Sequence, residues 1–176
     1  MSEAKEIREK SLAFFEKIDE LPTGERAALK RGAGTMLSEA DGRALTAFYR
    51  CLPRDVDKQE ECWFAAACLR CLWDPKLPSG LPFPKVVGRM LQAEELSDST
   101  AHRVEALLDT RWDNDGYLLA KLFRLIKLIR QKSDGVLLDF PALLDDLLKW
   151  NWENQTVQRS WAREIFAPQA IEREEN

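Results

Sequence analysis

The spacing of apolar residues predicts helices along nearly the whole chain. After Ser2, which can serve as an N-cap, Ile7, Phe14, Ile18 and Leu21 recur at spacings that place them on one face of an amphipathic helix. The same helical period predicts further helices at about 23–32, 38–52, 55–73, 85–91, 100–111, 115–132, 139–150 and 154–166. No segment shows the apolar alternation of a half-buried strand. The pattern therefore predicts an all-α fold, a compact multi-helix bundle.

One proline-rich stretch interrupts this pattern. Residues 74–84 hold Pro75, Pro78, Pro82, Pro84 and Gly80, a composition that excludes regular helix. We expect two closely packed helical lobes, with an N-terminal lobe at 1–73, a junction at 74–84 and a C-terminal lobe at 85–168. Residues 169–176 are expected to form a charged tail.

Composition limits the class of protein. The chain has 176 residues, of which 45% are hydrophobic, enough to build a core without disulfide or metal staples. No apolar stretch approaches the roughly 20 residues of a membrane-spanning helix, and the N-terminus is charged rather than signal-like. We therefore expect a cytoplasmic protein with no membrane association. Its four cysteines lack the spacing of a secreted scaffold and are expected to be reduced thiols.

The sequence offers little catalytic chemistry. His102 is the only histidine, which excludes histidine pairs and histidine-rich metal sites. Cys68 and Cys71 form a C-x-x-C pair, but it lies late in an apolar helix, so buried structural thiols are expected. Asp145 and Asp146 point about 100° apart on a helix and are interpreted as a solvated face. We expect no enzyme activity, catalytic residue, metal, cofactor or small-molecule substrate.

The tryptophans divide into two groups. Trp63, Trp73, Trp150 and Trp161 belong to apolar helical faces and are expected in the core. Trp112 and Trp152 lie beside acids near helix ends, and the pattern leaves their role open.

Positive charge is concentrated in two internal segments although the net charge is -4. Residues 23–54 hold six basic and three acidic side chains, and residues 103–132 hold seven and four. In the second segment, five basic residues and no acid lie between Lys121 and Lys132, along about 17 Å of predicted helix. Such a face can follow a phosphate backbone, or it can be solvated and pair with acids elsewhere in the fold. The sequence leaves both interpretations open.

Several of these segments together are similar to a known family. Lys30-Arg31 at the end of an early helix, followed by the Ala-Phe-Tyr-Arg segment at 47–50, resembles the CasB family, the small subunit of the type I-E CRISPR complex Cascade. The stretches 102–108, 118–126, 147–152 and 159–166 resemble the basic middle helices and the tryptophan-containing end of that family. The resemblance spans residues 26–166.

The resemblance implies a non-catalytic role in antiviral defence. It implies partners in the complex, namely the crRNA-bound backbone subunits, the large subunit and a second copy of the chain. It also implies a basic surface that stabilises crRNA and opened target DNA, the R-loop. By resemblance the contacts are Lys30, Arg31, Arg50, Arg103, Arg111, Lys121 and Arg124, and the basic helix adds Lys127. The alternative is an all-helical adaptor that binds only protein, with its basic helix facing an acidic partner.

Overall fold

The described part of the chain is helical almost throughout. The structure is a computed structural model that describes residues 2–73, 80–132 and 136–168. Its α-helices are α1 (Glu3–Glu20), α2 (Thr23–Arg31), α3 (Gly42–Cys51), α4 (Glu60–Arg70), α5 (Phe83–Gln92), α6 (Asp98–Leu108), α7 (Tyr117–Lys132), α8 (Phe140–Leu148) and α9 (Thr156–Phe166). Two 3-10 turns, η1 (Leu37–Glu39) and η2 (Glu153–Gln155), precede α3 and α9. The predicted all-α fold is confirmed.

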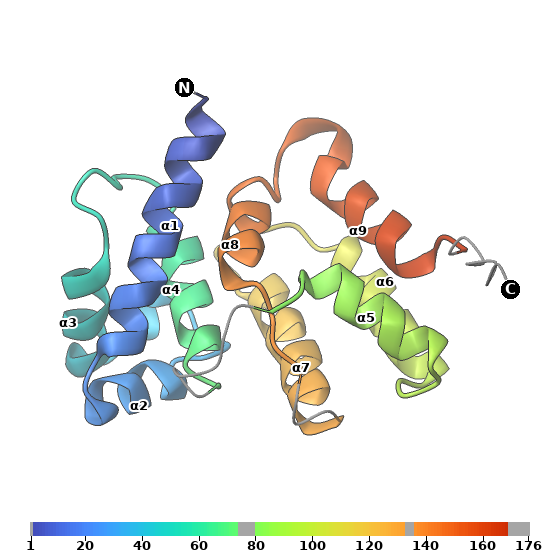
Figure 1. The fold of residues 1–176 in the computed structure, drawn as a ribbon, viewed down its shortest axis with the longest axis horizontal. Helices are drawn as coiled ribbons and strands as arrows, with labels where there is room; N and C mark the ends of the chain where they lie inside the picture. The colour runs from blue at the N-terminus through green and yellow to red at the C-terminus, as the bar shows by residue number, and fades with distance from the viewer. Residues whose placement is uncertain (1, 74–79, 133–135, 169–176) are drawn as a thin grey trace, which may run out of the picture.

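The helices form two groups joined by a shared middle. In Figure 1, α1 to α4 gather on one side, α5, α6 and α9 on the other, and α7 and α8 lie between them. Helix α8 packs against α1 and α4, α7 packs against α6, and α5 packs against α9. One continuous cluster of buried apolar side chains runs through both groups. The division into two lobes stays a prediction, and residues 74–79 of the predicted junction and the tail 169–176 lie outside the described residues.

A single pair of backbone contacts ties the start of α5 to the start of α8. The Leu81 amide donates to the Leu137 carbonyl at 2.9 Å, and the Asp139 amide donates to the Leu81 carbonyl at 2.8 Å. Within the described residues this is the one β-bridge. The Asp139 carboxylate then caps α8 by accepting from the Ala142 amide at 3.0 Å.

Several helix boundaries differ from the prediction because tertiary contacts or local backbone override periodicity. Helix α3 begins at Gly42 rather than near residue 38, since Asp41 caps it by accepting from the Ala44 amide at 2.8 Å. Helix α4 begins at Glu60 rather than near residue 55, because Gln59 is left-handed with φ 58°. Helix α6 ends at Leu108 rather than near residue 111 because residues 110–112 form hydrogen bonds with the segment after α8. The helix predicted from about residue 154 begins at Thr156, because Asn154 is left-handed, and it has no side-chain cap.

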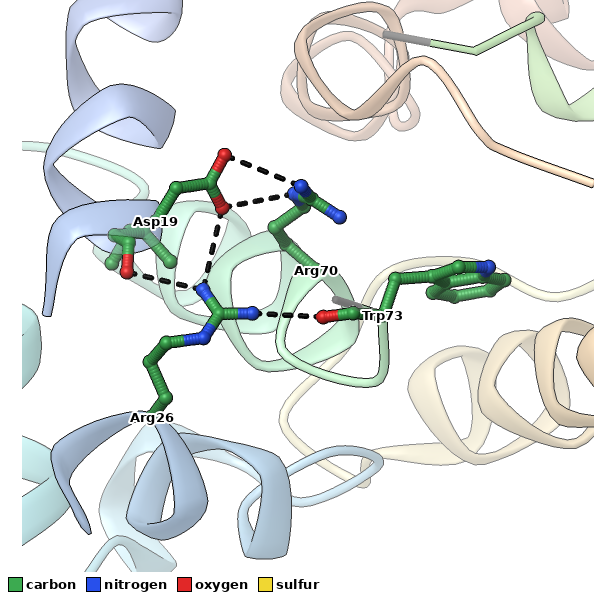
Figure 2. Close-up of polar contacts among 5 residues, drawn as sticks. Asp19, Arg26, Arg70 and Trp73 are labelled. Atoms are coloured by element: carbon green, nitrogen blue, oxygen red, sulfur yellow. Dashed lines mark hydrogen bonds and ion pairs between the residues drawn. The ribbon is translucent and has the colours of Figure 1, made fainter. Parts of the chain in front are cut away.

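A buried ionic cluster joins α1, α2 and α4 (Figure 2). Arg26 and Arg70 are only 8% and 7% exposed, so their cations need partners inside the protein. Arg26 donates to the Asp19 carboxylate at 3.3 Å, to the Ile18 carbonyl at 3.1 Å and to the Trp73 carbonyl at 2.9 Å. The Arg70 Nε lies 3.0 Å from the same carboxylate. One carboxylate therefore serves two buried cations.

The four tryptophans predicted in the core are buried there, whereas the prediction for Asp146 is wrong. Trp63, Trp73, Trp150 and Trp161 are each at most 6% exposed. Asp146, predicted on a solvated face, instead accepts a hydrogen bond from Trp161 Nε1 at 2.8 Å and is half-buried. The bond joins α8 to α9. Burial raises the pKa of Asp146, and the Trp161 bond partly opposes that rise.

Asp146 offers a direct test of this bond. The substitution Asp146→Ala is expected to lower the free energy of unfolding by about 1–3 kcal/mol, because the Trp161 N–H loses its acceptor. Asp146→Asn keeps an acceptor oxygen and should cost less than alanine. Urea denaturation of both variants measures this, and equal stabilities for Asn and Ala would contradict it.

The same residue predicts a pH effect. Since its pKa is higher in the folded than in the unfolded state, its contribution to stability is complete below the unfolded pKa and is lost as pH rises through the folded pKa. The stability of wild type relative to Asp146→Asn should therefore fall as pH rises across the acidic range. A constant difference would show that Asp146 is as well solvated as in the unfolded chain.

Candidate nucleic-acid interface

Four of the predicted residues meet in one groove between α6 and α7. The groove has a volume of about 640 Å³ and is bordered by Arg103 from α6 and by Lys121, Arg124 and Lys127 from α7. Its other lining residues are Ala106, Leu125, Leu128 and Gln131, so none of the described residues that line it is acidic. The α7 side chains that face the core are apolar, which turns its basic residues outward. Periodicity and helix packing together therefore produce a positively charged groove.

The basic groups of the groove keep their charge available. Lys121 Nζ donates to the Thr110 hydroxyl at 2.7 Å, a neutral acceptor that positions the ammonium without cancelling its charge. The Lys127 ammonium lies 5.9 Å from the centre of the Phe123 ring, a cation–π contact. Across the described residues, no acid forms an ion pair with any of the four basic groups. Of the two interpretations of this helix, the geometry favours a face open to an external anion.

A short loop leads from Lys30 and Arg31 to α7, and neither residue lines the groove. Both are exposed at the end of α2, and Gly32 ends that helix. Gly34 follows with φ +84° and packs so closely on α7 that an added Cβ would lie 2.7 Å from Phe123 Cδ1. Phe123 also contacts Lys127. The loop that follows Lys30 and Arg31 therefore packs against α7, the helix that carries Lys127.

Arg50 and Arg111 lie apart from the groove. Arg50, on α3, donates to both oxygens of Glu25 at 2.7 and 2.9 Å, so its charge is compensated within the protein. Arg111 is exposed in the segment between α6 and α7, where the helix predicted to carry it has already ended. The groove thus gathers Arg103, Lys121, Arg124 and Lys127 but neither of these two.

The cysteines are buried, and the histidine is exposed on α6. All four cysteines are free and buried. Burial raises the pKa of Cys51 and Cys71 to about 11 and that of Cys62 to about 12, and it also raises the pKa of Cys68 well above its usual value. His102 is exposed and lies 3.4 Å from Glu105. In the described ranges no group of histidine, cysteine and acidic side chains is placed to hold a metal, and no helix is long and apolar enough to cross a membrane.

A comparison with protein families decides the relationship. The family model of the CRISPR-associated protein Cse2 matches residues 25–166. The chain belongs to the Cse2 family. The resemblance to CasB is thereby confirmed, and the matched region contains every residue of the groove.

Individual Cse2 and CasB proteins agree with this assignment. The Cse2 protein of Thermus thermophilus is 30% identical over 117 residues, which cover 66% of this chain and 63% of that protein. The crystal structure of CasB from Thermus thermophilus is similar with a TM-score of 0.72 and 25% identity, over 96% of this chain and all of that one. A chain of a solved CRISPR RNA-guided surveillance complex shares the fold, with a TM-score of 0.70, 23% identity, and 90% and 92% coverage.

Sequence reasoning missed the residues whose role depends on distant partners. Arg26 counts toward the positive charge of residues 23–54, but it is buried against Asp19 and Trp73 and adds nothing to the surface. Arg50 and Glu25 are 25 positions apart, so no helical spacing indicates their pairing. A basic residue within an otherwise apolar helix face, as at Arg70 in α4, was the one available signal of a buried cation.

Proposed function

We propose that this Cse2 family member is a non-catalytic subunit of a type I-E CRISPR RNA-guided surveillance complex, Cascade, in which the α6–α7 groove binds the backbone of crRNA or target DNA. Its proposed protein partners are the crRNA-bound backbone subunits, the large subunit and a second copy of the chain. Family membership supports the setting, and the shared fold of a chain in a solved surveillance complex is consistent with it. The observation that carries the proposal is the groove itself, which has four basic side chains, an apolar floor and no acid among the described residues that line it.

The chemistry of the groove suits phosphate rather than bases. Arginine and lysine contacts to phosphate release condensed counterions, and they hold a strand without reading its sequence. R-loop formation exchanges one duplex for another of similar stability, so a few backbone contacts can shift the balance. Such a role requires position and charge, and the proposal assigns the groove no reaction.

The proposal is tested by removing charge from the groove while keeping polar side chains there. The variant Lys121→Gln, Arg124→Gln, Lys127→Gln should weaken target-DNA binding by the assembled complex for all sequences alike. The slope of log K against log salt concentration should also become less steep by up to about three units. Each phosphate contact that is lost accounts for about one unit. Binding is measured at two or more salt concentrations with complexes that carry wild type or variant.

The matched control removes the same charge elsewhere. Lys5→Gln, Arg8→Gln, Lys17→Gln changes three exposed basic residues of α1 and gives the same net charge. It should leave both affinity and salt slope near those of wild type. If the groove variant also matches wild type while the complex assembles normally, the groove is a solvated face and the adaptor alternative gains support.

A further inference from the structure

A second surface lies at the loop between α8 and α9. Trp152 is 57% exposed, whereas the core tryptophans are at most 6% exposed. Lys149 lies over its ring, with Nζ 5.5 Å from the ring centre. A large apolar side chain held out in solvent loses the free energy that burial would provide, so a partner that covers Trp152 would recover it.

Hydrogen bonds from three other segments hold this loop in place. Gln59, which precedes α4, donates to the Leu148 carbonyl at 2.9 Å. Gln158 of α9 donates to the Trp150 carbonyl at 2.7 Å. The Asn151 side chain accepts from the Trp112 amide at 2.9 Å and donates to the Trp112 carbonyl at 2.7 Å. The exposed indole is therefore carried by a fixed backbone, which lowers the ordering cost of binding.

The backbone just after Trp152 is also unusual. Asn154 and Gln155 both adopt left-handed conformations, with φ of 64° and 52°. Two successive non-glycine residues in this region are strained, and they persist only where their surroundings fix them. This turn sends the chain directly from the tryptophan into α9, so the indole is carried on a short, sharply turned connection.

The charges around Trp152 indicate which class of partner it fits. Glu153 follows it, and Asp145 is ion-paired with Lys149 at 2.9 Å. Across the Asn151 bridge, Trp112 is followed by exposed Asp113 and Asp115. Lys149 and Asp145 compensate each other, so Glu153, Asp113 and Asp115 remain in the segments 111–115 and 149–153 against one basic residue, Arg111. An acidic border repels phosphate and favours a basic protein surface, unlike the α6–α7 groove.

We propose that Trp152 and its acidic border form a docking surface for a different protein chain, one that offers an apolar pocket bordered by lysine or arginine. This inference rests on the proposed function, because the complex supplies the partner. Exposed, rigidly held tryptophans are the side chains that most often dominate protein interfaces. The surface thus assigns protein contact to one end of the molecule and nucleic-acid contact to the groove.

A second copy of this chain is the less suitable occupant. The basic surface it would offer is the α6–α7 groove, and seating Trp152 there joins two different faces. Such a contact is heterologous, so it repeats from copy to copy into a ring or a filament. It would also cover the groove that the proposed function needs.

The test measures how tightly the labelled chain joins a complex assembled from the other subunits and crRNA without it. Trp152→Ala should weaken this association by about 30-fold or more, the effect of losing a dominant interface residue. Trp152→Phe, which keeps an aromatic ring, should lose less. If Trp152→Ala binds within about twofold of wild type, the docking surface is overturned.

Charge reversal tests the acidic border. The pair Asp113→Lys, Glu153→Lys should weaken association most strongly at low salt, whereas Glu3→Lys, Glu9→Lys on α1 provides the same charge change as a control and should behave as wild type. A photo-reactive p-benzoylphenylalanine at position 152 should cross-link to a lysine- or arginine-rich segment of another subunit. Cross-linking to nucleic acid or to a second copy overturns the proposal.

These outcomes separate the two proposals. If wild type does not join the complex, the proposed function fails and takes the docking surface with it. If wild type joins the complex and the Trp152 variants join it equally tightly, the docking surface alone fails. Circular dichroism and the melting temperature of each free variant confirm that the exposed substitutions leave the fold intact.

Discussion

Replacing Asp19 with alanine is expected to destabilise the protein by about 3–5 kcal/mol, because it removes the carboxylate that two buried arginines share. Arg26 would keep its two carbonyl acceptors, but carbonyl dipoles do not neutralise a cation in the interior. Domains of this size have total stabilities of about 5–15 kcal/mol, so the variant should unfold at much lower denaturant concentration than wild type. Urea denaturation followed by tryptophan fluorescence measures the shift.

Two further variants separate charge from shape at this position. Asp19→Asn keeps one acceptor oxygen but removes the charge, and it should fall between wild type and alanine. Glu16→Ala removes an exposed acid from the same helix and should change stability by no more than about 0.5 kcal/mol. A loss for Asp19→Ala as small as that of Glu16→Ala would show that solvent reaches the cluster and screens its charges.

The second large effect concerns the inner face of α7. Leu122 and Ile126 are 1% and 0% exposed, and truncation of either to alanine should cost about 2–5 kcal/mol through lost burial and the remaining cavity. Lys127→Ala on the outer face should stay within about 0.5 kcal/mol of wild type. Thermal or chemical denaturation gives all three values. Equal losses for Ile126→Ala and Lys127→Ala would mean that α7 is not packed as described.

The inner-face variants of α7 also serve as stability controls for the binding test of the groove. A loss of DNA binding after substitution of Arg124 or Lys127 is informative only if the helix still folds. The inner-face variants show how large a stability loss must be before binding suffers for structural reasons. A groove variant that binds poorly yet melts as wild type therefore lacks phosphate-binding groups rather than structure.

Much of the fold could be predicted because helices depend on local patterns. The apolar face of α7 follows from residues three and four positions apart, and the Asp139 cap depends on a residue three positions away. The groove was predicted in part, since one helix supplies three of its four basic residues. Packing of α6 on α7 supplies Arg103, and no local pattern indicates that neighbour.

What could not be predicted depends on contacts between distant segments. Helix α6 ends early because Trp150 donates to the Thr110 carbonyl, 40 positions away, at 2.8 Å. Asp146 looks solvated from its helix alone, and only the packing of α9 brings Trp161 to it. In each case a long-range hydrogen bond outweighs a local preference of a fraction of a kcal/mol, such as the roughly 0.7 kcal/mol range of helix propensities.

The four buried thiols make the folded protein unreactive toward thiol reagents. Only the thiolate attacks maleimides or oxidants, and with the pKa of Cys51 and Cys71 at about 11 almost none is present at neutral pH. One cysteine introduced at an exposed position, such as Ser38→Cys, would then accept a fluorescent dye without removal of the native four. Labelling of the native cysteines would in turn report unfolding of the core.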